Sequence, residues 1–297
     1  MFNGTANIIK PPGVSSFKLI KHLRWLLDEK KAGHTGTLDP AAAGVLGVCF
    51  GKATKTIPFI DDSTKTYIGE MQLGKQTDTL DLEGEVIKED LKWNRLDQKV
   101  VEEVIKNFQG EQEQIPPMYS AVHHQGQRLY KLARKGIEVE RKAREVEVYS
   151  IKIIDISLPV IRMKLKVSRG TYIRSLVRDI GEQLGSSAVM TFLLRTQSGP
   201  FKIEEAVRIE DIEKYGSEIL MESYQPLELP KYTVKDSSLF RAEHGNYLLD
   251  KDFVEDEIEL ELGDYFLCFS EDGRFLNISE YKLKDEYLFY QPVKVFI

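Results

Sequence analysis

The chain has 297 residues, of which 42% are hydrophobic and 30% charged, as in a globular protein with room for one substantial domain and a smaller one. It contains no apolar run of about 18 residues and begins with nothing like a signal peptide, so we expect a cytoplasmic protein that spans no membrane. The net charge of −6 argues against a nucleic-acid partner, but residues 123–144 hold seven Lys or Arg and only two acids, which can form a local basic surface.

The chain opens with a predicted strand over 6–10, which Pro11 and Pro12 end, followed by a helix that Ser15 or Ser16 caps. The three- and four-residue spacing of its apolar side chains predicts a buried face. That face consists of Phe17, Ile20, Leu23 and Leu27. The opposite, exposed side carries Lys18, Lys21 and Arg24.

Residues 31–40 read Lys-Ala-Gly-His-Thr-Gly-Thr-Leu-Asp-Pro and form a predicted irregular loop before a buried strand over 45–50. Gly33 and Gly36 permit tight turns, and Pro40 restricts Asp39 to extended backbone conformations. The loop can therefore hold the Asp39 carboxylate in one direction, between a helix and a core strand. The alternative is an Asx turn with no further role.

Beyond this loop, alternation and apolar periodicity predict both strands and helices. Strands are expected over 65–73, 145–156, 159–167 and 190–196, and in the C-terminal part over 265–269, 275–279 and 287–296. Helices are expected over 96–108 and 129–135, and a further helix opens at 168–174 and ends at Gly185. The apolar face predicted for the first of these consists of Val100, Val101, Val104, Ile105 and Phe108. Residues 74–84 are expected to form an irregular polar loop, and the prolines of 224–230 indicate a linker.

We expect neither a metal nor a redox cofactor. Cys49 and Cys268 lie far apart in apolar runs, which favours two buried thiols over a disulfide or a metal site. The five histidines lack metal-ligand spacing, and the acidic loop of residues 78–83 fails the EF-hand pattern because leucines interrupt it. The chain also contains no dinucleotide-binding or P-loop motif.

Four separated motifs stand at residues 10–16, 33–40, 65–67 with 77–81, and 169–174. Together they resemble the tRNA pseudouridine synthases of the TruB type, which convert a T-loop uridine, position 55 in tRNA numbering, to pseudouridine. Residues 116–121 with 126–130 match the insertion typical of this type. The 33–40 loop is the most specific of these. Two positions depart from the family pattern: Ile9 replaces an acidic residue, and His123 replaces a lysine.

The resemblance implies that Asp39 is the catalytic carboxylate. A carboxylate can attack a carbon or stabilise a cationic sugar and then leave, and the sequence leaves open whether it attacks C1′ or C6 or assists a glycal route. Arg174 matches the cation that keeps this carboxylate ionised in a dry pocket. Tyr67 matches the aromatic residue that stacks on the target base and can act as its general base, although core packing alone would also explain it. The reaction needs no cofactor.

The target uridine is stacked inside folded tRNA, so the enzyme must flip it out. The resemblance gives RNA-facing roles to His34, Tyr172, Asp81, Lys10, Arg128 and Lys131. His34 matches the residue that stacks in the rearranged loop, with a capping histidine as the alternative. Asp81 would order the active-site loop through hydrogen bonds. Basic side chains of the insertion, and Lys18, Lys21 and Arg24 of the predicted first helix, would contact phosphates.

The implied fold is α+β: a pseudouridine synthase fold with a mixed, mostly antiparallel central sheet. We expect a catalytic domain over residues 1–223, with an RNA-clamping insertion at about 109–145, and a small PUA-like β domain over 231–297. The implied partner is the T arm of tRNA. The protein is expected to act as a monomer with no obligatory protein partner.

Three other functions are compatible with parts of the sequence. A guide-RNA-dependent pseudouridine synthase usually carries extended or lysine-rich termini, which are not seen before the final Phe296 and Ile297. A tRNA-binding or tRNA-folding protein without catalysis would not need Asp39, Tyr67 and Arg174. A glycosidase should offer a second acid placed for proton donation, and the sequence nominates none.

Overall fold

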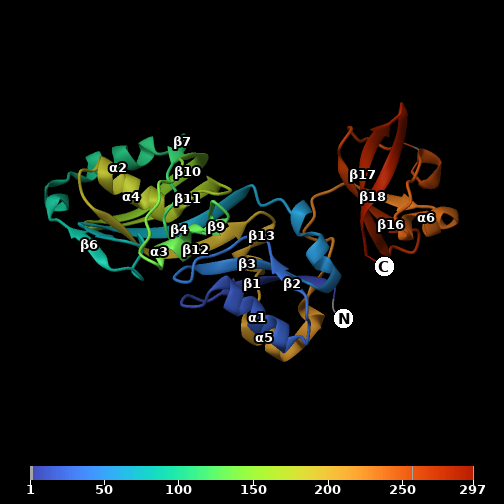
Figure 1. Ribbon diagram of the computed structural model, residues 1–297, viewed down its shortest axis with the longest axis horizontal. Coiled ribbons are helices and arrows are strands. Elements are labelled where there is room, and N and C mark those ends of the chain that lie inside the picture. The colour runs from blue at the N-terminus through green and yellow to red at the C-terminus, as the bar shows by residue number, and fades with distance from the viewer. Residues whose placement is uncertain (1–2, 256, 297) are drawn as a thin grey trace.

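The computed structural model describes residues 3–255 and 257–296. The four remaining residues, which fall within the predicted domains 1–223 and 231–297, lie outside the described part. The described chain forms a large twisted sheet with helices packed on it and, beside it, a smaller sheet built from the C-terminal residues (Figure 1).

The main sheet has ten described strands, and eight of them follow the order β14-β1-β3-β12-β4-β11-β10-β7. Neighbours pair antiparallel except β3 and β12, which run parallel through two residue pairs. Two short strands lie off this path: β2 pairs with β3, and β13 pairs with β12. The ten strands are β1 (Gly4–Lys10), β2 (Ala32–His34), β3 (Ala43–Phe50), β4 (Thr64–Leu73), β7 (Gly110–Gln114), β10 (Arg144–Ser157), β11 (Val160–Ser168), β12 (Ala188–Ser198), β13 (Phe201–Lys202) and β14 (Met221–Glu222).

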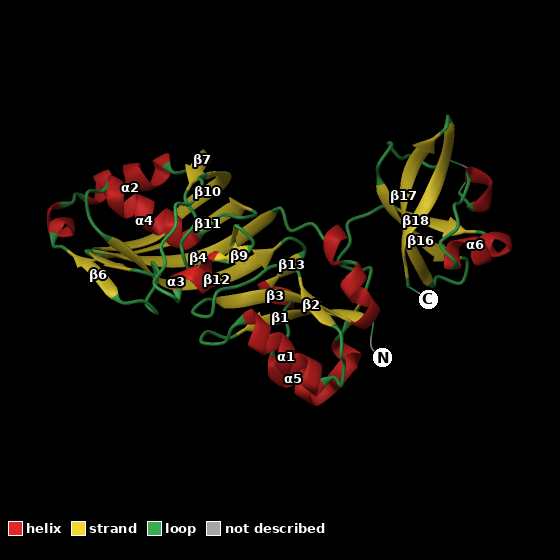
Figure 2. Ribbon diagram, in the orientation of Figure 1, coloured by secondary structure: helices red, strands yellow, loops and turns green. Residues whose placement is uncertain are grey.

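Four helices bury apolar faces against this sheet because their apolar residues recur every three or four positions. They are α1 (Ser16–Leu26), α2 (Gln98–Asn107), α4 (Ile173–Gln183) and α5 (Ile209–Tyr215). Helices α1 and α5 pack at the β1–β3 part of the sheet, and α2 and α4 pack at the β4–β11–β10 part (Figures 1 and 2). Ser15 caps α1 as predicted, since its side chain accepts a hydrogen bond from the Lys18 amide.

Two residues predicted to lie on buried helix faces are exposed. The prediction for Phe17 is wrong, because the buried side of α1 consists of Leu19, Ile20, Leu23 and Leu27, and Phe17 projects away from it with 77% of its surface exposed. Val100 on α2 is likewise exposed. The buried face of α1 is thus shifted around the helix toward Leu19, and that of α2 excludes Val100.

The connecting segments contain structure that the sequence did not predict. The loop expected over 74–84 includes β5 (Lys75–Thr77), which forms a hairpin with β6 (Val86–Glu89). The range expected for the insertion, 109–145, begins with β7, an edge strand of the main sheet. The rest of that range holds the predicted short helix α3 (Leu129–Ala133) and a small hairpin of β8 (His123–His124) and β9 (Gln127–Arg128).

The C-terminal residues form a four-stranded sheet with its own apolar core. Its strands are β15 (Lys231–Val234), β16 (Tyr265–Ser270), β17 (Phe275–Lys284) and β18 (Tyr287–Val295), and it is accompanied by α6 (Leu239–Glu243). The last three strands were expected from the sequence. Strand β15, which pairs parallel with β16, was not.

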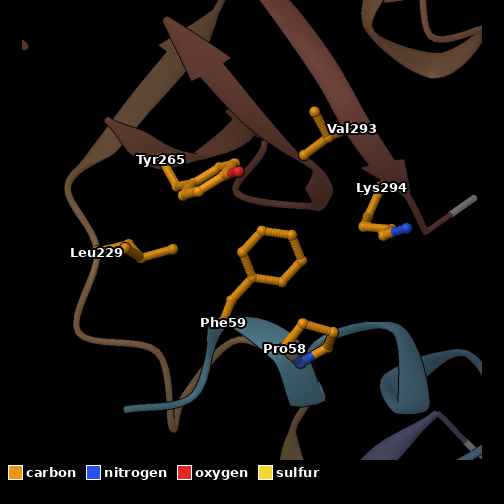
Figure 3. A pocket seen from close by; sticks show the side chains of 6 residues that line it. All are labelled: Pro58, Phe59, Leu229, Tyr265, Val293 and Lys294. Carbon is orange, nitrogen blue, oxygen red and sulfur yellow. The ribbon is translucent and has the colours of Figure 1, made fainter. Parts of the chain in front are cut away.

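A shared apolar cluster joins this small sheet to the rest of the molecule. The ring of Phe59, from the 3-10 helix η2 (Ile57–Phe59), lies among Leu229, Val293 and Tyr265, with its centroid 5.0 Å from that of Tyr265 (Figure 3). Leu227, in the segment expected to be a linker, is buried in the same cluster. The segment is therefore packed against its neighbours along part of its length.

These features confirm the α+β class with a mixed, mostly antiparallel sheet and a small C-terminal β unit. Cys49 and Cys268 are buried free thiols, as predicted, and burial raises the pKa of Cys268 to about 12. Among the described residues, no helix combines the length and apolar character needed to cross a bilayer, and no three His, Cys, Asp or Glu side chains are grouped to hold a metal.

Candidate active site

Asp39 lies on the loop between β2 and β3, and three hydrogen bonds tie this loop to the start of α1. The hydroxyl of Ser16 donates to the carbonyl of Leu38 at 2.9 Å and accepts from the Leu38 amide at 3.0 Å. The amide of Gly13 donates to the carbonyl of Pro40 at 2.8 Å. Because Leu38 itself is buried, the residue beside it is held in place, and the side chain of Asp39 keeps 31% of its surface exposed.

Arg174 faces this carboxylate from the first turn of α4. Its Nη2 atom lies 2.9 Å from Oδ2 of Asp39, and the guanidinium also donates to the carbonyls of Thr79 and Tyr119, each at 2.8 Å. Only 4% of the Arg174 side chain is exposed. A charge buried to this extent is stable only when it is paired and hydrogen-bonded, and here two carbonyls and a carboxylate supply the partners.

Asp81 contacts the same guanidinium from the β5–β6 hairpin, with Oδ2 3.6 Å from Nη1 of Arg174. Its other oxygen accepts hydrogen bonds from the Thr79 hydroxyl at 2.6 Å and the Glu83 amide at 3.1 Å. The hydroxyl of Thr77 donates to the Asp81 carbonyl, and Leu80 adopts a left-handed backbone with φ of 64°. Asp81 therefore orders this turn beside the site through hydrogen bonds.

Tyr67 lies on β4 and is buried, with 7% of its surface exposed. Burial raises the pKa of its phenol; the nearby Arg195 guanidinium opposes this shift and the Asp39 carboxylate adds to it. The phenol is therefore protonated at neutral pH. This favours the ring as a contact surface over the phenolate as a general base.

Arg195, on β12, is a site residue that the sequence reading missed. Its guanidinium is fully buried and donates to three carbonyls of the Asp39 loop and β3: Val45 at 2.9 Å, Gly36 at 3.1 Å and Thr37 at 3.3 Å. It thus holds the main chain on both sides of Asp39. The available signal was an arginine inside the apolar run predicted as a strand over 190–196.

Lys10 also holds the loop main chain. Its ammonium is fully buried and donates to the carbonyls of Val14 at 2.7 Å, Pro11 at 2.8 Å and Pro40 at 3.2 Å. Burial lowers its pKa to about 8, which the Asp39 charge partly opposes. The RNA contact expected of Lys10 would need an exposed ammonium, whereas here the group points into the protein.

The structure brings two other predicted residues into the surroundings of the site. His34 ends β2, and burial lowers the pKa of its imidazole, so the ring is neutral near pH 7. Tyr172 precedes α4, exchanges two hydrogen bonds between its backbone and the Gln114 side chain, and stacks beneath the Arg144 guanidinium at 4.5 Å. Both side chains are half-buried.

The remaining two predicted residues belong to the insertion. Arg128 ends β9 and Lys131 lies on α3, and both are exposed, as an RNA-contacting role requires. The insertion reaches the site through its own backbone, because the Tyr119 carbonyl accepts from Arg174. The site therefore combines a carboxylate, a buried guanidinium and a buried aromatic ring from three separated segments.

Comparison with solved structures defines the class of this fold. A chain of an H/ACA ribonucleoprotein bound to a substrate RNA containing 2′-deoxyuridine is similar with a TM-score of 0.74 and 25% identity. A chain of a Cbf5-Nop10-Gar1 complex is similar with the same TM-score and 28% identity, and each comparison covers 99% of this chain and 85% of the other. The architecture is the pseudouridine synthase fold.

Sequence comparison narrows the class to one family. Residues 24–173 match the TruB family pseudouridylate synthase N-terminal domain, and residues 174–229 match the tRNA pseudouridylate synthase B C-terminal domain. The chain is 41% identical to tRNA pseudouridine synthase B of Clostridium tetani (89% of this chain, 94% of the relative) and 40% identical to that of Syntrophomonas wolfei (99% and 98%). The chain belongs to the TruB family, and the predicted enzyme class, an isomerase that forms pseudouridine, is confirmed.

Proposed function

We propose that this protein converts uridine 55 in the T loop of tRNA to pseudouridine, with Asp39 as the catalytic carboxylate. One observation carries the proposal: Oδ2 of Asp39 lies 2.9 Å from a guanidinium that is almost fully buried, while the Asp39 side chain itself remains partly exposed. A carboxylate held in this way is fixed in direction by its partner and accessible, as attack on a substrate carbon requires.

The reaction breaks the bond between N1 of uracil and C1′ of ribose and forms a bond between C5 and C1′, and the proton on C5 is finally lost. Asp39 attacks the substrate or stabilises the cationic sugar, and it is released when the new carbon–carbon bond forms. Arg174 pairs with the carboxylate at 2.9 Å and fixes its direction. Arg195 holds the loop main chain, so little reorganisation is needed when the base arrives.

The surrounding residues suit a flipped base. The ring of Tyr67 is proposed to stack on the uracil, and His34, neutral at pH 7, is proposed to stack in the rearranged T loop. Asp81 orders the adjoining turn, and Tyr172 is proposed to lie beside the bound base. Arg128 and Lys131 are proposed to contact phosphates from the insertion. Lys10 is assigned instead to support of the loop.

We further propose that the protein works in the cytoplasm as a monomer, without a guide RNA. The two relatives described above, both named tRNA pseudouridine synthase B, are 40–41% identical to this chain, whereas the two solved ribonucleoprotein chains are 25–28% identical. A guide-dependent enzyme would leave a bare tRNA transcript unmodified. Activity on that transcript alone therefore separates the two functions.

The test uses an unmodified tRNA transcript with the wild type, with Asp39→Asn and with Asp155→Asn, an exposed aspartate on β10, as the matched control. We expect the wild type and the control to form pseudouridine at position 55 alone. Asp39→Asn should lower the rate by more than about a thousandfold while the dissociation constant for tRNA stays within a few-fold. Full activity of Asp39→Asn would refute the assignment. A wild type that binds tRNA without modifying it would favour a tRNA-folding protein.

A further inference from the structure

The outer side of α1 carries an unusual row of side chains. Phe17 and Trp25 are exposed over 77% and 75% of their surfaces, and Lys21 lies between them. The three residues are four positions apart, so they lie on one side of the helix and span about 12 Å along its axis. We call Phe17, Lys21 and Trp25 the α1 stripe. Two large aromatic rings in water on one helix are a cost to solubility and indicate a binding surface.

The charge of α1 identifies the kind of partner. The eleven residues of the helix include Lys18, Lys21 and Arg24 and no Asp or Glu. Helices α2 and α4, by contrast, each contain two basic and two acidic residues. All three cations of α1 are exposed. In a chain of net charge −6, this concentration of positive charge around exposed rings complements a polyanion.

Trp25 contacts another ring of its own helix. Its ring is stacked with that of His22, with centroids 5.8 Å apart and an angle of 22° between the planes. His22 in turn lies 3.7 Å from a carboxylate oxygen of Glu213 on α5. The indole is thus in offset contact with an imidazole, and 75% of the surface of Trp25 remains exposed. An exposed aromatic face of this kind is what a nucleic-acid base needs for stacking.

The N-terminal end of α1 lies beside the loop that carries Asp39. The first residue of α1, Ser16, exchanges both hydrogen bonds with Leu38, next to Asp39. A polyanion whose base lies at Asp39 is therefore brought close to the start of α1. The exposed residues of the stripe follow along the same helix, so they can contact nucleotides other than the one that reacts.

We propose that the α1 stripe is a second tRNA contact, at which an unpaired base of the tRNA stacks on Trp25 while Lys18, Lys21 and Arg24 bind neighbouring phosphates. This inference rests on the proposed function, because it takes tRNA as the substrate. Unpaired bases are the required partners, since bases inside a duplex keep their faces stacked on one another. The contact supplies affinity and takes no part in the isomerisation.

Trp25 reports on its own environment, because the chain has only one other tryptophan, Trp93. In Trp93→Phe, saturation with unmodified tRNA transcript should quench the emission of Trp25. In the matched variant Trp25→Phe, the remaining Trp93 emission should not change. A perfectly paired RNA duplex should leave Trp25 unquenched. Unchanged Trp25 emission at tRNA saturation, with binding verified by filter retention, would overturn the proposal.

Affinity measurements separate the two parts of the contact. Trp25→Ala should weaken tRNA binding roughly tenfold, Trp25→Phe by less, and both should raise KM without lowering kcat. Lys21→Ala should reduce the slope of log affinity against log salt by about 0.7 to 0.9, whereas Trp25→Ala should leave that slope unchanged. Tyr287→Ala is the matched control, since Tyr287 is 78% exposed but follows Asp285 and Glu286. Its affinity should equal that of the wild type.

The outcomes distinguish this proposal from the proposed function. If the wild type modifies the tRNA but Trp25→Ala binds it as tightly as the wild type, only the α1 stripe proposal fails. If Tyr287→Ala weakens binding as much as Trp25→Ala, the effect is not specific to α1 and the proposal also fails. If the wild type forms no pseudouridine, the proposed function fails, whereas tRNA-dependent quenching of Trp25 would still support a tRNA contact at α1.

Discussion

Three buried cations define the candidate site at the scale of single residues. Arg174, Arg195 and Lys10 are all at least 96% buried, and each donates hydrogen bonds to main-chain carbonyls near Asp39. Removing a charged group from water is costly unless such partners are present. Carbonyls of the Asp39 loop thus bind Arg195 and Lys10. Arg174 instead pairs with the Asp39 carboxylate itself, at 2.9 Å, and fixes its direction.

Arg195→Lys tests this support. A lysine keeps the charge but cannot reach three carbonyls with the planar fork of a guanidinium, so the loop should lose part of its order. We expect kcat to fall about tenfold to a hundredfold and the free energy of unfolding to fall by about 1–3 kcal/mol. The measurements are single-turnover kinetics and chemical denaturation. Arg162→Lys, at an exposed arginine paired with Glu70, should change neither; equal effects in both variants would contradict the role given to Arg195.

Lys10 predicts a specific dependence of stability on pH. Its pKa in the folded protein is about 8, below the ordinary value of 10.5, so the folded state releases this proton first. The cost of the buried charge is fully present below pH 8 and is relieved as pH rises through that value, because the unfolded chain then binds more protons. Relative to Lys10→Met, the wild type should gain about 1 kcal/mol of unfolding free energy between pH 7 and pH 9. Parallel pH curves from chemical denaturation would show that Lys10 does not titrate in this range.

Some of these site residues could be predicted from the sequence and others could not, for physical reasons. Asp39, Tyr67 and Arg174 lie in motifs that match a known family. The composition of the Asp39 motif also does not suit a regular helix or strand. Arg195 lies in an apolar run that predicts a strand correctly and conceals the arginine within it. A buried cation whose partners are main-chain carbonyls is not paired with an acidic side chain. A search of the sequence for side chains of opposite charge therefore cannot find its partners. Lys10 was expected to contact RNA. Its burial depends on tertiary contacts, which the sequence does not show.

At the scale of elements, the parallel junction of β3 and β12 positions the Asp39 loop. Leu194 pairs with Ala43 and Arg195 pairs with Gly44, so the backbone of Arg195 lies directly beside the end of the Asp39 loop. Gly44 has a φ of 115°, and a Cβ atom there would lie 2.1 Å from the Arg195 carbonyl oxygen. Only glycine therefore permits this approach of two backbones.

Gly44→Ala should be severely destabilising because it combines an unfavourable φ with a backbone clash that cannot relax. We expect a loss of more than about 3 kcal/mol of unfolding free energy. Gly110→Ala is the matched control, since Gly110 has a nearly equal φ of 111° with nothing within 4 Å of the added Cβ, and it should lose only about 1 kcal/mol. Urea denaturation of both variants checks the comparison, and equal losses would exclude the clash as the cause.

Local patterns predicted most elements, but not their pairing. Apolar periodicity located α1, α2 and α4 and the long strands, because each buries one face. It missed β5, β7 and β15, which are short and polar or lie at sheet edges where little apolar surface is buried. The parallel pairing of β3 with β12 joins segments about 150 residues apart, and no local signal specifies it.

At the scale of the whole molecule, the α+β class and the separate C-terminal sheet followed from the sequence, whereas the connection between the two parts did not. The prolines of 224–230 exclude regular structure, which is why a linker was expected. They do not prevent packing: Leu227 is buried, and the Tyr224 ring meets that of Phe269 edge-on at 4.9 Å. Lys55 adds a hydrogen bond to the Val295 carbonyl at 2.6 Å. The two sheets are thus joined through side chains from several segments.

The bond between Arg195 and the Asp39 loop has a consequence for biosynthesis. Ribosomes make the loop early, but its carbonyls receive the guanidinium only after residue 195 has emerged, on the order of 10 to 30 seconds later at ordinary elongation rates. A nascent or prematurely terminated chain therefore carries Asp39 without the support that aims it. Chains that end before β12 should therefore form no pseudouridine, even though they contain Asp39 and Arg174.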